Sequence, residues 1–228
     1  MRRVTGVLVH PRATMAEVVR HPAFITTWVV VLLVAAVCGG LFLSTPTGRQ
    51  ALVDERVAIT EALGGRIDDD AYERLRQDPP VSIYLTSGGR VLLTPPVSIA
   101  VALGLMALGR FEGERVTFIT ALAITVHATV VLALQQVVAT PMHYLSESVR
   151  SPTNVAGLLR LFDEGSWPQR LLSAVDAFGL WWMWLLAVGT GAATGRPARR
   201  YIWKMLAVYV GIAAIVAALF AVLGESGI

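Results

Sequence analysis

Long runs without a charged side chain dominate the pattern of this chain. Five of them extend for 19 residues or more, and short polar segments rich in charge separate them. Because an α-helix rises about 1.5 Å per residue, about 20 apolar residues cross a hydrocarbon layer of roughly 30 Å. The runs are Ala23–Gly48, Val91–Gly109, Val116–Ser146, Ala177–Gly195 and Met205–Gly224. This pattern predicts an all-α, polytopic membrane bundle with five transmembrane helices, folded as a single domain over residues 1–228.

Turn and capping residues narrow the bounds of these helices. In the second run, Thr94 followed by Pro95 and Pro96 indicates an N-cap and a first helical turn, which leaves a helix of about sixteen residues. We expect this helix either to cross as a short span or to enter and leave the membrane on one side. The predicted spans are approximately 23–43, 92–109, 116–140, 175–195 and 203–224.

The N-terminal segment is expected to lie at the membrane surface. After Pro11, Thr14 and Glu17 have the spacing of a capping box. Met15, Val18 and Val19 form an apolar stripe. A short interfacial helix fits this pattern.

The longest polar insertion, residues 47–80, is predicted to form a helical hairpin outside the cytoplasm. Its two helices cover residues 51–63 and 68–77, and paired glycines and paired prolines end them. Asp68, Asp69 and Asp70 begin the second helix, where carboxylates complement the helix dipole. Their spacing does not match that of a calcium-binding loop, so no metal site is predicted.

Composition and charge agree with a membrane protein. Only 15% of the residues are charged and 55% are apolar, against about 25% charged residues in an ordinary soluble domain. The basic residues are dispersed over the connections, which argues against nucleic-acid binding. Cys38 is the single cysteine, so no intrachain disulfide forms.

The distribution of Lys and Arg predicts the orientation. Ten of the nineteen basic residues lie in short connections on one side of the predicted bundle, and nine are spread over longer, acid-rich connections on the other. Because dense positive charge in short loops resists translocation, we expect a cytoplasmic N-terminus and an extracytoplasmic C-terminus.

A few polar side chains fall inside the predicted spans, and they are the candidate site residues. His127 is expected near the midplane of span three. Gln135 and Gln136 end that span level with Asp176, which begins span four, so an amide-to-carboxylate hydrogen bond is predicted there. Ionisable groups at this depth are often functional, and the alternative to packing is a proton or solute pathway.

Small residues predict where helices approach one another, because they let backbones come close in lipid. The candidates for helix packing are Gly39, Gly40, Gly104, Gly191 and Gly195.

The last third of the chain carries a resemblance to a known family. Residues 176–182, Asp-Ala-Phe-Gly-Leu-Trp-Trp, precede an apolar stretch ending at Gly189, a short basic turn and a final apolar run from Tyr201. Together with Pro11, Thr14 and the loop Phe111-Glu-Gly113, this resembles the bacterial branch of the Yip family, the Ypt-interacting membrane proteins. The resemblance covers nearly the whole chain. It implies a helical bundle in a bacterial inner membrane with a cytoplasmic N-terminus, and it marks Asp176, Phe178 and Trp181 as motif residues without a catalytic duty.

The sequence contains no HExxH, GxSxG or Walker motif. We therefore expect a protein that is not an enzyme and uses no cofactor. The favoured hypothesis is a membrane scaffold that binds lipids, other membrane proteins or a second copy of itself. The alternative is a permease or transporter subunit that uses the intramembrane polar residues.

Overall fold

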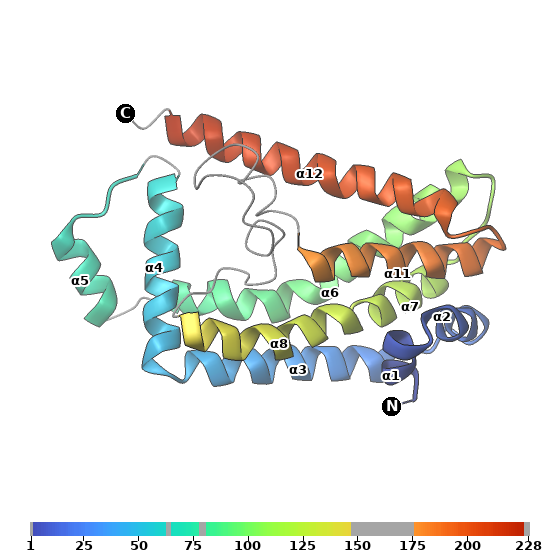
Figure 1. Ribbon diagram of the computed structural model, residues 1–228, viewed down its shortest axis with the longest axis horizontal. Helices are drawn as coiled ribbons and strands as arrows, with labels where there is room; N and C mark the ends of the chain where they lie inside the picture. The colour runs from blue at the N-terminus through green and yellow to red at the C-terminus, as the bar shows by residue number, and fades with distance from the viewer. Residues whose placement is uncertain (1, 63–64, 78–80, 147–175, 226–228) are drawn as a thin grey trace. The chain divides into compact units, whose positions relative to one another are not determined.

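The protein is helical throughout the part of the chain that the computed structural model describes, residues 2–62, 65–77, 81–146 and 176–225. Figure 1 shows the helices along the chain. Their bounds are α1 Arg2–Val9, α2 Pro11–Arg20, α3 Ile25–Leu43, α4 Pro46–Ala62, α5 Asp69–Gln77, α6 Val81–Phe111, α7 Phe118–Ala128, α8 Val130–Ser146, α11 Ala177–Thr194 and α12 Arg199–Glu225. These helices form two compact units, which are described separately.

The first unit contains residues 1–35, 91–136 and 178–209, and its core is built on α7 and α11. Every residue of α7 from Ala121 to Ala128 is buried, as are Leu185–Gly191 of α11. Gly189 makes this packing possible, because a Cβ atom there would lie 2.4 Å from Ile124 Cγ2. At this contact the backbone of α11 therefore lies directly against the branched side chain of Ile124 in α7.

The N-terminal segment folds as two helices, and it differs from the sequence prediction in its start. Pro11 is the first residue of α2, and His10 precedes it without a side-chain cap. Thr14 lies inside the helix against Gly6 of α1, and Glu17 pairs with Arg3 at 3.1 Å. The predicted capping box is therefore wrong, because the proline starts the helix earlier and both of its polar residues contact α1.

The apolar stripe of this segment was predicted correctly, and the structure adds what it faces. Met15 and Val18 are fully buried, and α2 packs on α7 together with α1. The stripe thus contributes to the core of the first unit.

Helix α6 runs through Pro95 and Pro96 without interruption. The expected helix start at Thr94 is therefore wrong. Each proline lacks one backbone donor, and transmembrane helices tolerate this loss because nearby groups re-satisfy the backbone. Ser98 Oγ donates to the carbonyl of Thr94 at 2.7 Å. The apolar part of α6, Val91–Phe111, has 21 residues and is long enough to cross a membrane.

Helices α7 and α8 form one long rod with a local irregularity at Thr129. Thr125 Oγ1 donates to the carbonyl of Ala121 at 2.9 Å, and Thr129 Oγ1 donates to that of Thr125 at 2.8 Å. Such bonds compete with the regular ladder and bend helices, which accounts for the break between α7 and α8. Together they present an apolar stretch from Phe118 to Leu145.

The second unit contains residues 36–90, 137–177 and 210–228. Within it, the aromatic rings of Phe42 in α3 and His143 in α8 have centroids 5.8 Å apart. A tight turn then leads into α4, which runs across the end of α3 in Figure 1. Gly48 permits this turn, because a Cβ there would lie 2.0 Å from the carbonyl oxygen of Phe42.

Helices α4 and α5 pack against each other, as the sequence pattern predicted for this insertion. Leu52 and Val53 of α4 are buried against Tyr72 and Leu75 of α5. Asp68 caps α5, since its Oδ1 accepts from the Ala71 N–H at 2.7 Å. The placement of this pair outside the cytoplasm stays a prediction.

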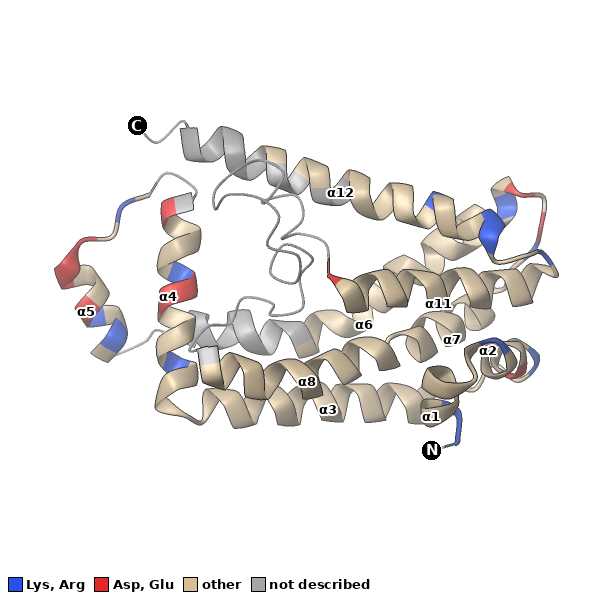
Figure 2. Ribbon diagram, viewed as in Figure 1, with Lys and Arg blue, Asp and Glu red and all other residues tan. Residues whose placement is uncertain are grey.

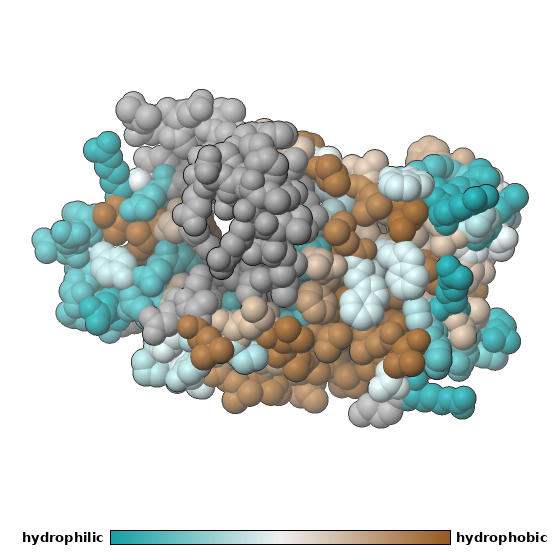
Figure 3. All heavy atoms as spheres, in the orientation of Figure 1, coloured by the Kyte–Doolittle hydropathy of each residue, from teal (hydrophilic) through white to brown (hydrophobic). Residues whose placement is uncertain are grey.

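Within the described residues, four helical stretches are long and apolar enough to cross a membrane: Ile25–Leu43, Val91–Phe111, Phe118–Leu145 and Ala177–Thr194. They correspond to the first four predicted spans. Helix α12 covers the fifth along its length, and a fifth crossing stays a prediction. Figure 3 shows apolar residues gathered over α3.

Candidate functional site

His127, the ionisable residue predicted inside span three, is fully buried in α7. Its Nδ1 lies 2.8 Å from the carbonyl oxygen of Ala123, and its Nε2 lies 3.1 Å from Thr27 Oγ1. A carbonyl only accepts, so Nδ1 carries the proton; in the neutral ring, Nε2 accepts from the Thr27 hydroxyl. Both ring nitrogens are therefore used in joining α3 to α7.

The depth of His127 in a membrane stays a prediction, and its contacts place it along the helices. Its partner Thr27 is the third residue of α3, so the histidine lies level with the beginning of that helix. The ion pair between Arg3 and Glu17 joins α1 and α2, the two helices that pack on α7. Charges of this kind belong at the edge of a membrane. His127 thus marks a polar level where the N-terminal helices meet the bundle.

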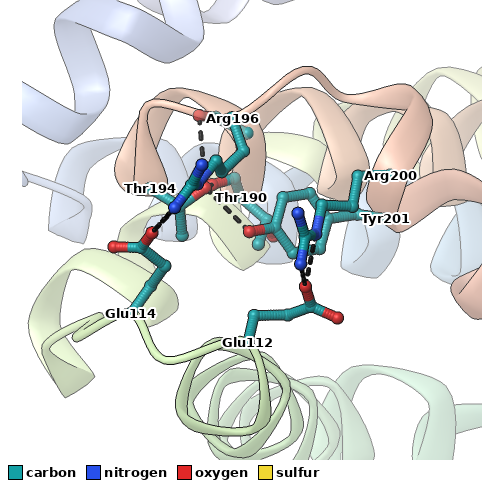
Figure 4. A network of polar contacts seen from close by, with 8 residues as sticks. Glu112, Glu114, Thr190, Thr194, Arg196, Arg200 and Tyr201 are labelled. Atoms are coloured by element: carbon teal, nitrogen blue, oxygen red, sulfur yellow. Dashed lines mark hydrogen bonds and ion pairs between the residues drawn. The ribbon is translucent and has the colours of Figure 1, made fainter.

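A second polar cluster joins two connections that are far apart in the sequence (Figure 4). Glu112 lies between α6 and α7, and it contacts both Arg200 and Lys204 at the start of α12. Glu114 in the same connection pairs with Arg196, with its Oε1 2.9 Å from Nη2 and 3.0 Å from Nε. We call these five residues the charged clasp.

The backbone around the charged clasp is held by its own bonds. Gly195 has a φ of +67° and ends α11, and the N–H of Arg196 donates to the carbonyl of Gly191 at 3.1 Å. This is the pattern of a Schellman cap. Tyr201 is fully buried, and its hydroxyl donates to Thr194 Oγ1 at 2.9 Å. These bonds fix the conformation of the connection between α11 and α12, which positions the arginines beside the glutamates.

Glu112 is the central residue of the charged clasp. Its side chain is 7% exposed, against 27% for that of Glu114. A carboxylate removed from water to this extent needs its partners, because an unpaired charge there is costly. Sequence reasoning missed the clasp, since its partners are separated by 82 to 92 positions. The acidic loop between two basic segments was its only local signal.

A comparison with protein families bears on these two clusters and on the helices that carry them. The family model described as the Yip1 domain matches residues 5–222. The chain belongs to the Yip1 domain family. The match extends over α1 to α12 and so covers both His127 and the charged clasp. Comparisons with curated proteins and with solved structures give no match.

The Yip1 motif residues of the sequence analysis lie at and beyond the start of α11. Phe178 and Trp181 stack with ring centroids 6.3 Å apart, because positions three apart share a helix face. Both pack against the core of the first unit. Asp176, half-buried, directly precedes α11 and falls in the second unit.

Gln135 and Gln136 lie half-buried in α8 of this Yip1 chain, in the first unit. Their predicted hydrogen bond to Asp176 links residues of different units, and it stays a prediction.

The glycines predicted to pack helices have different surroundings. An added Cβ at Gly39, Gly40 or Gly104 would meet no described heavy atom within 4 Å, and their packing role stays a prediction. At Gly191 it would lie 2.7 Å from the carbonyl oxygen of Arg196. Gly191 and Gly195 therefore take part in the cap of α11. Gly189, which was not among the glycines predicted to pack helices, is the glycine at the contact between α7 and α11.

The side chains of these clusters can hold helices together, and their chemistry is that of hydrogen bonds and ion pairs. In the described ranges, no three His, Cys, Asp or Glu residues gather closely enough to hold a metal ion. The Yip1 chain is an integral membrane protein of apolar helices, and its membership fits a protein without enzymatic activity.

Proposed function

We propose that this Yip1 protein is a non-enzymatic membrane scaffold that binds lipids or partner membrane proteins through the outer faces of its helices. The proposal includes five spans in a bacterial inner membrane, with the N-terminus in the cytoplasm.

One observation carries the proposal: an apolar stripe that runs the length of α3. Its members recur every four residues and therefore lie on one helix face. They are Ile25, Val29, Leu33, Val37 and Leu41, and each is 50% to 70% exposed. A soluble monomer does not present such a stripe to water. Lipid chains or the helices of another membrane protein are the surfaces that match it.

The proposed orientation is supported by the charges around the charged clasp. The clasp cations and the arginines of α1 and α2 belong to the first unit, and Figure 2 shows both sets of basic residues at the same end of it. These segments are short, which is the situation in which positive charge keeps a loop in the cytoplasm.

A permease or transporter subunit is less well supported. Such a role needs a hydrated path to the intramembrane histidine. His127 is fully buried, and both of its nitrogens are engaged. Among the described residues, His127 lines neither the cavity bordered by Arg49 and Arg76 nor the one bordered by His10 and Trp184. A closed environment of this kind suits a packing role.

The proposal is tested by purifying the protein in a mild detergent and examining it by native mass spectrometry. A photo-crosslinking residue at Leu33 reports on the exposed stripe, and the same residue at the buried Ile124 is the control. We expect retained phospholipid or a membrane-protein adduct from position 33 and neither from position 124. Recovery of bare monomer, with no adduct at position 33, would contradict the proposal.

A further inference from the structure

A cavity of about 600 Å³ lies at the turn from α3 into α4, within the second unit. Its lining combines two cations, one carboxylate and an apolar floor. Arg49, Gln50 and Asp54 line it from α4, and Arg76 lines it from α5. Pro46, Thr47 and the buried Val53 also line it.

The cavity is held open by contacts between α4 and α5. Leu52 and Val53 pack on Leu75, so the two helices are fixed beside each other. Three hydrogen bonds also join the two helices or their side chains. The Tyr72 hydroxyl donates to Asp54 Oδ1 at 2.6 Å. Gln50 Nε2 donates to the same hydroxyl oxygen at 2.6 Å and to Asp54 Oδ1 at 3.0 Å. These bonds fix the carboxylate group of Asp54 by one of its two oxygens.

The polar groups around the cavity can make further hydrogen bonds and ion pairs. Within the described ranges, Asp54 Oδ2 has no hydrogen-bond donor and Arg49 has no ion-pair partner. Among the described residues, Arg76 pairs only with Glu73 on its own helix, at 3.5 Å and with both side chains about half exposed. Exposed pairs of this kind contribute little, so the guanidinium of Arg76 is available to a stronger anion.

The complementary ligand therefore carries an anion for two guanidinium groups and a donor for one carboxylate oxygen. Guanidinium groups bind phosphate through paired N–H donors, and a carboxylate accepts from a primary ammonium. A compact zwitterion with a phosphate and an ammonium satisfies both.

The position of the cavity indicates the source of this zwitterion. Pro46 follows Leu43, the last residue of α3, by three positions, and α4 runs across the end of that helix (Figure 1). If α3 spans the hydrocarbon, the cavity lies at the level of the lipid headgroups. We propose that this cavity binds the headgroup of an aminophospholipid, with its phosphate between Arg49 and Arg76 and its primary ammonium on Asp54. This inference rests on the lipid-binding part of the proposed function.

The donor requirement makes the site selective among phospholipids. A primary ammonium donates N–H bonds to Asp54 Oδ2. The quaternary ammonium of phosphatidylcholine has no N–H group, and the hydroxyl groups of phosphatidylglycerol donate hydrogen bonds without a positive charge, which are weaker to a carboxylate than those of an ammonium. All three lipids carry the phosphate, so the arginines set the affinity and Asp54 sets the selectivity.

The test uses the full chain in nanodiscs or vesicles made from each of these three lipids. Lipid retention is measured by native mass spectrometry after dilution into detergent. We expect phosphatidylethanolamine to be retained about tenfold more than the other two, which is the effect of one charge-assisted hydrogen bond. Asp54→Asn keeps an oxygen that accepts from Tyr72, and we expect it to remove the selectivity. Arg49→Ala and Arg76→Ala are each expected to lower retention of all three lipids.

Arg56→Ala and Arg74→Ala are matched controls, because these exposed arginines lie on the same two helices and do not line the cavity. Both are expected to behave like the wild type. Equal retention of the three lipids, or equal effects of cavity and control variants, would overturn the assignment. If soluble phosphoethanolamine competed with the same affinity as the lipid, the proposal that the ligand is a membrane lipid would be overturned.

The failure of this site is distinguishable from the failure of the proposed function. If phosphatidylethanolamine selectivity is missing while phospholipid or a partner still binds at the α3 stripe, only the cavity assignment is overturned. If neither lipid nor partner is retained anywhere, both are overturned.

Discussion

At the scale of single residues, the role of each glycine depends on what faces it. Gly104 and Gly189 both lie inside apolar helices, and the sequence around them looks alike. In the structure, a Cβ at Gly104 would meet no heavy atom of the described residues within 4 Å, whereas a Cβ at Gly189 would overlap Ile124 of α7. The sequence predicted that small residues matter for packing, and it selected Gly39, Gly40, Gly104, Gly191 and Gly195. It missed Gly189, because the facing residue lies 65 positions away and leaves no local signal.

The difference between these two glycines predicts opposite effects of the same substitution. Gly189→Ala is expected to lower stability by about 1 to 3 kcal/mol, the usual cost of overpacking a core. Gly104→Ala is expected to be neutral or to raise stability by up to about 1 kcal/mol, because alanine favours the helix. Thermal unfolding in detergent, followed by tryptophan fluorescence, measures both.

Ile124 supplies a second-site check on this prediction. Ile124→Ala removes the Cγ2 atom that a new Cβ at position 189 would meet. The double variant Gly189→Ala, Ile124→Ala should therefore be less damaged than the sum of the two single variants. Simple additivity would contradict the contact.

At the scale of helices and their connections, local pattern predicted most elements and few of their pairings. The helices of the insertion were predicted because paired glycines and paired prolines mark their ends. The predicted start of helix α6 was too late in the chain, because two consecutive prolines usually mark the first turn of a helix in soluble proteins. The charged clasp was not predicted, because ion pairs between distant connections depend on how the helices are arranged. His127 was found from its rarity in an apolar run, but its contact with Thr27 of α3, 100 positions away, was not predicted.

The charged clasp predicts unequal effects of removing its two acids. Glu112→Gln is expected to destabilise the protein by about 1 to 3 kcal/mol, because Glu112 is nearly buried and holds two cations. Glu114→Gln is expected to cost about 0 to 1 kcal/mol, since its single pair is more exposed. Unfolding midpoints and protease cleavage between α11 and α12 report both effects. Equal sensitivity of the two variants would count against the clasp as described.

The pairing of α4 and α5 predicts a dependence on alkaline pH. The pKa of Tyr72 is raised above its ordinary 10.0, mainly because its hydroxyl donates to Asp54, and burial and the Asp54 charge add to this. Gln50 and Arg76 act in the opposite direction. Since the folded pKa exceeds the unfolded one, the stabilisation is complete below pH 10 and is lost as the pH rises through the raised pKa.

An ultraviolet titration of phenolate absorbance, taken as wild type minus Tyr72→Phe, isolates this group. We expect the difference signal to titrate above pH 10. Titration at or below the ordinary value would mean that Tyr72 and Asp54 are not bonded in solution.

At the scale of the whole molecule, hydropathy carried the prediction furthest. The all-helical class and four membrane-length helices follow from apolar runs alone, because a helix in lipid must satisfy its backbone internally. The family membership also agrees with the resemblance seen in residues 176–182. The number of crossings depends on α12, which is 27 residues long and thus about 40 Å at the usual rise per residue.

A reporter fused to Ile228 tests the number and direction of the spans together. With five crossings and a cytoplasmic N-terminus, we expect a periplasmic reporter such as alkaline phosphatase to be active there. A cytoplasmic reporter at the same position should be silent, while one fused before Arg2 should be active. Cytoplasmic activity at Ile228 would mean an even number of crossings.

The proline pair of α6 has a consequence for how that helix can bend. The nitrogen of a proline carries no hydrogen and donates no hydrogen bond. The carbonyl oxygens of Val91 and Leu92 therefore accept no backbone hydrogen bond from the residues four positions later, Pro95 and Pro96. Helix α6 therefore has fewer backbone hydrogen bonds in the turn before the prolines, and it resists bending least there. Any flexing of α6 will concentrate there, with the residues on either side moving as stiff segments.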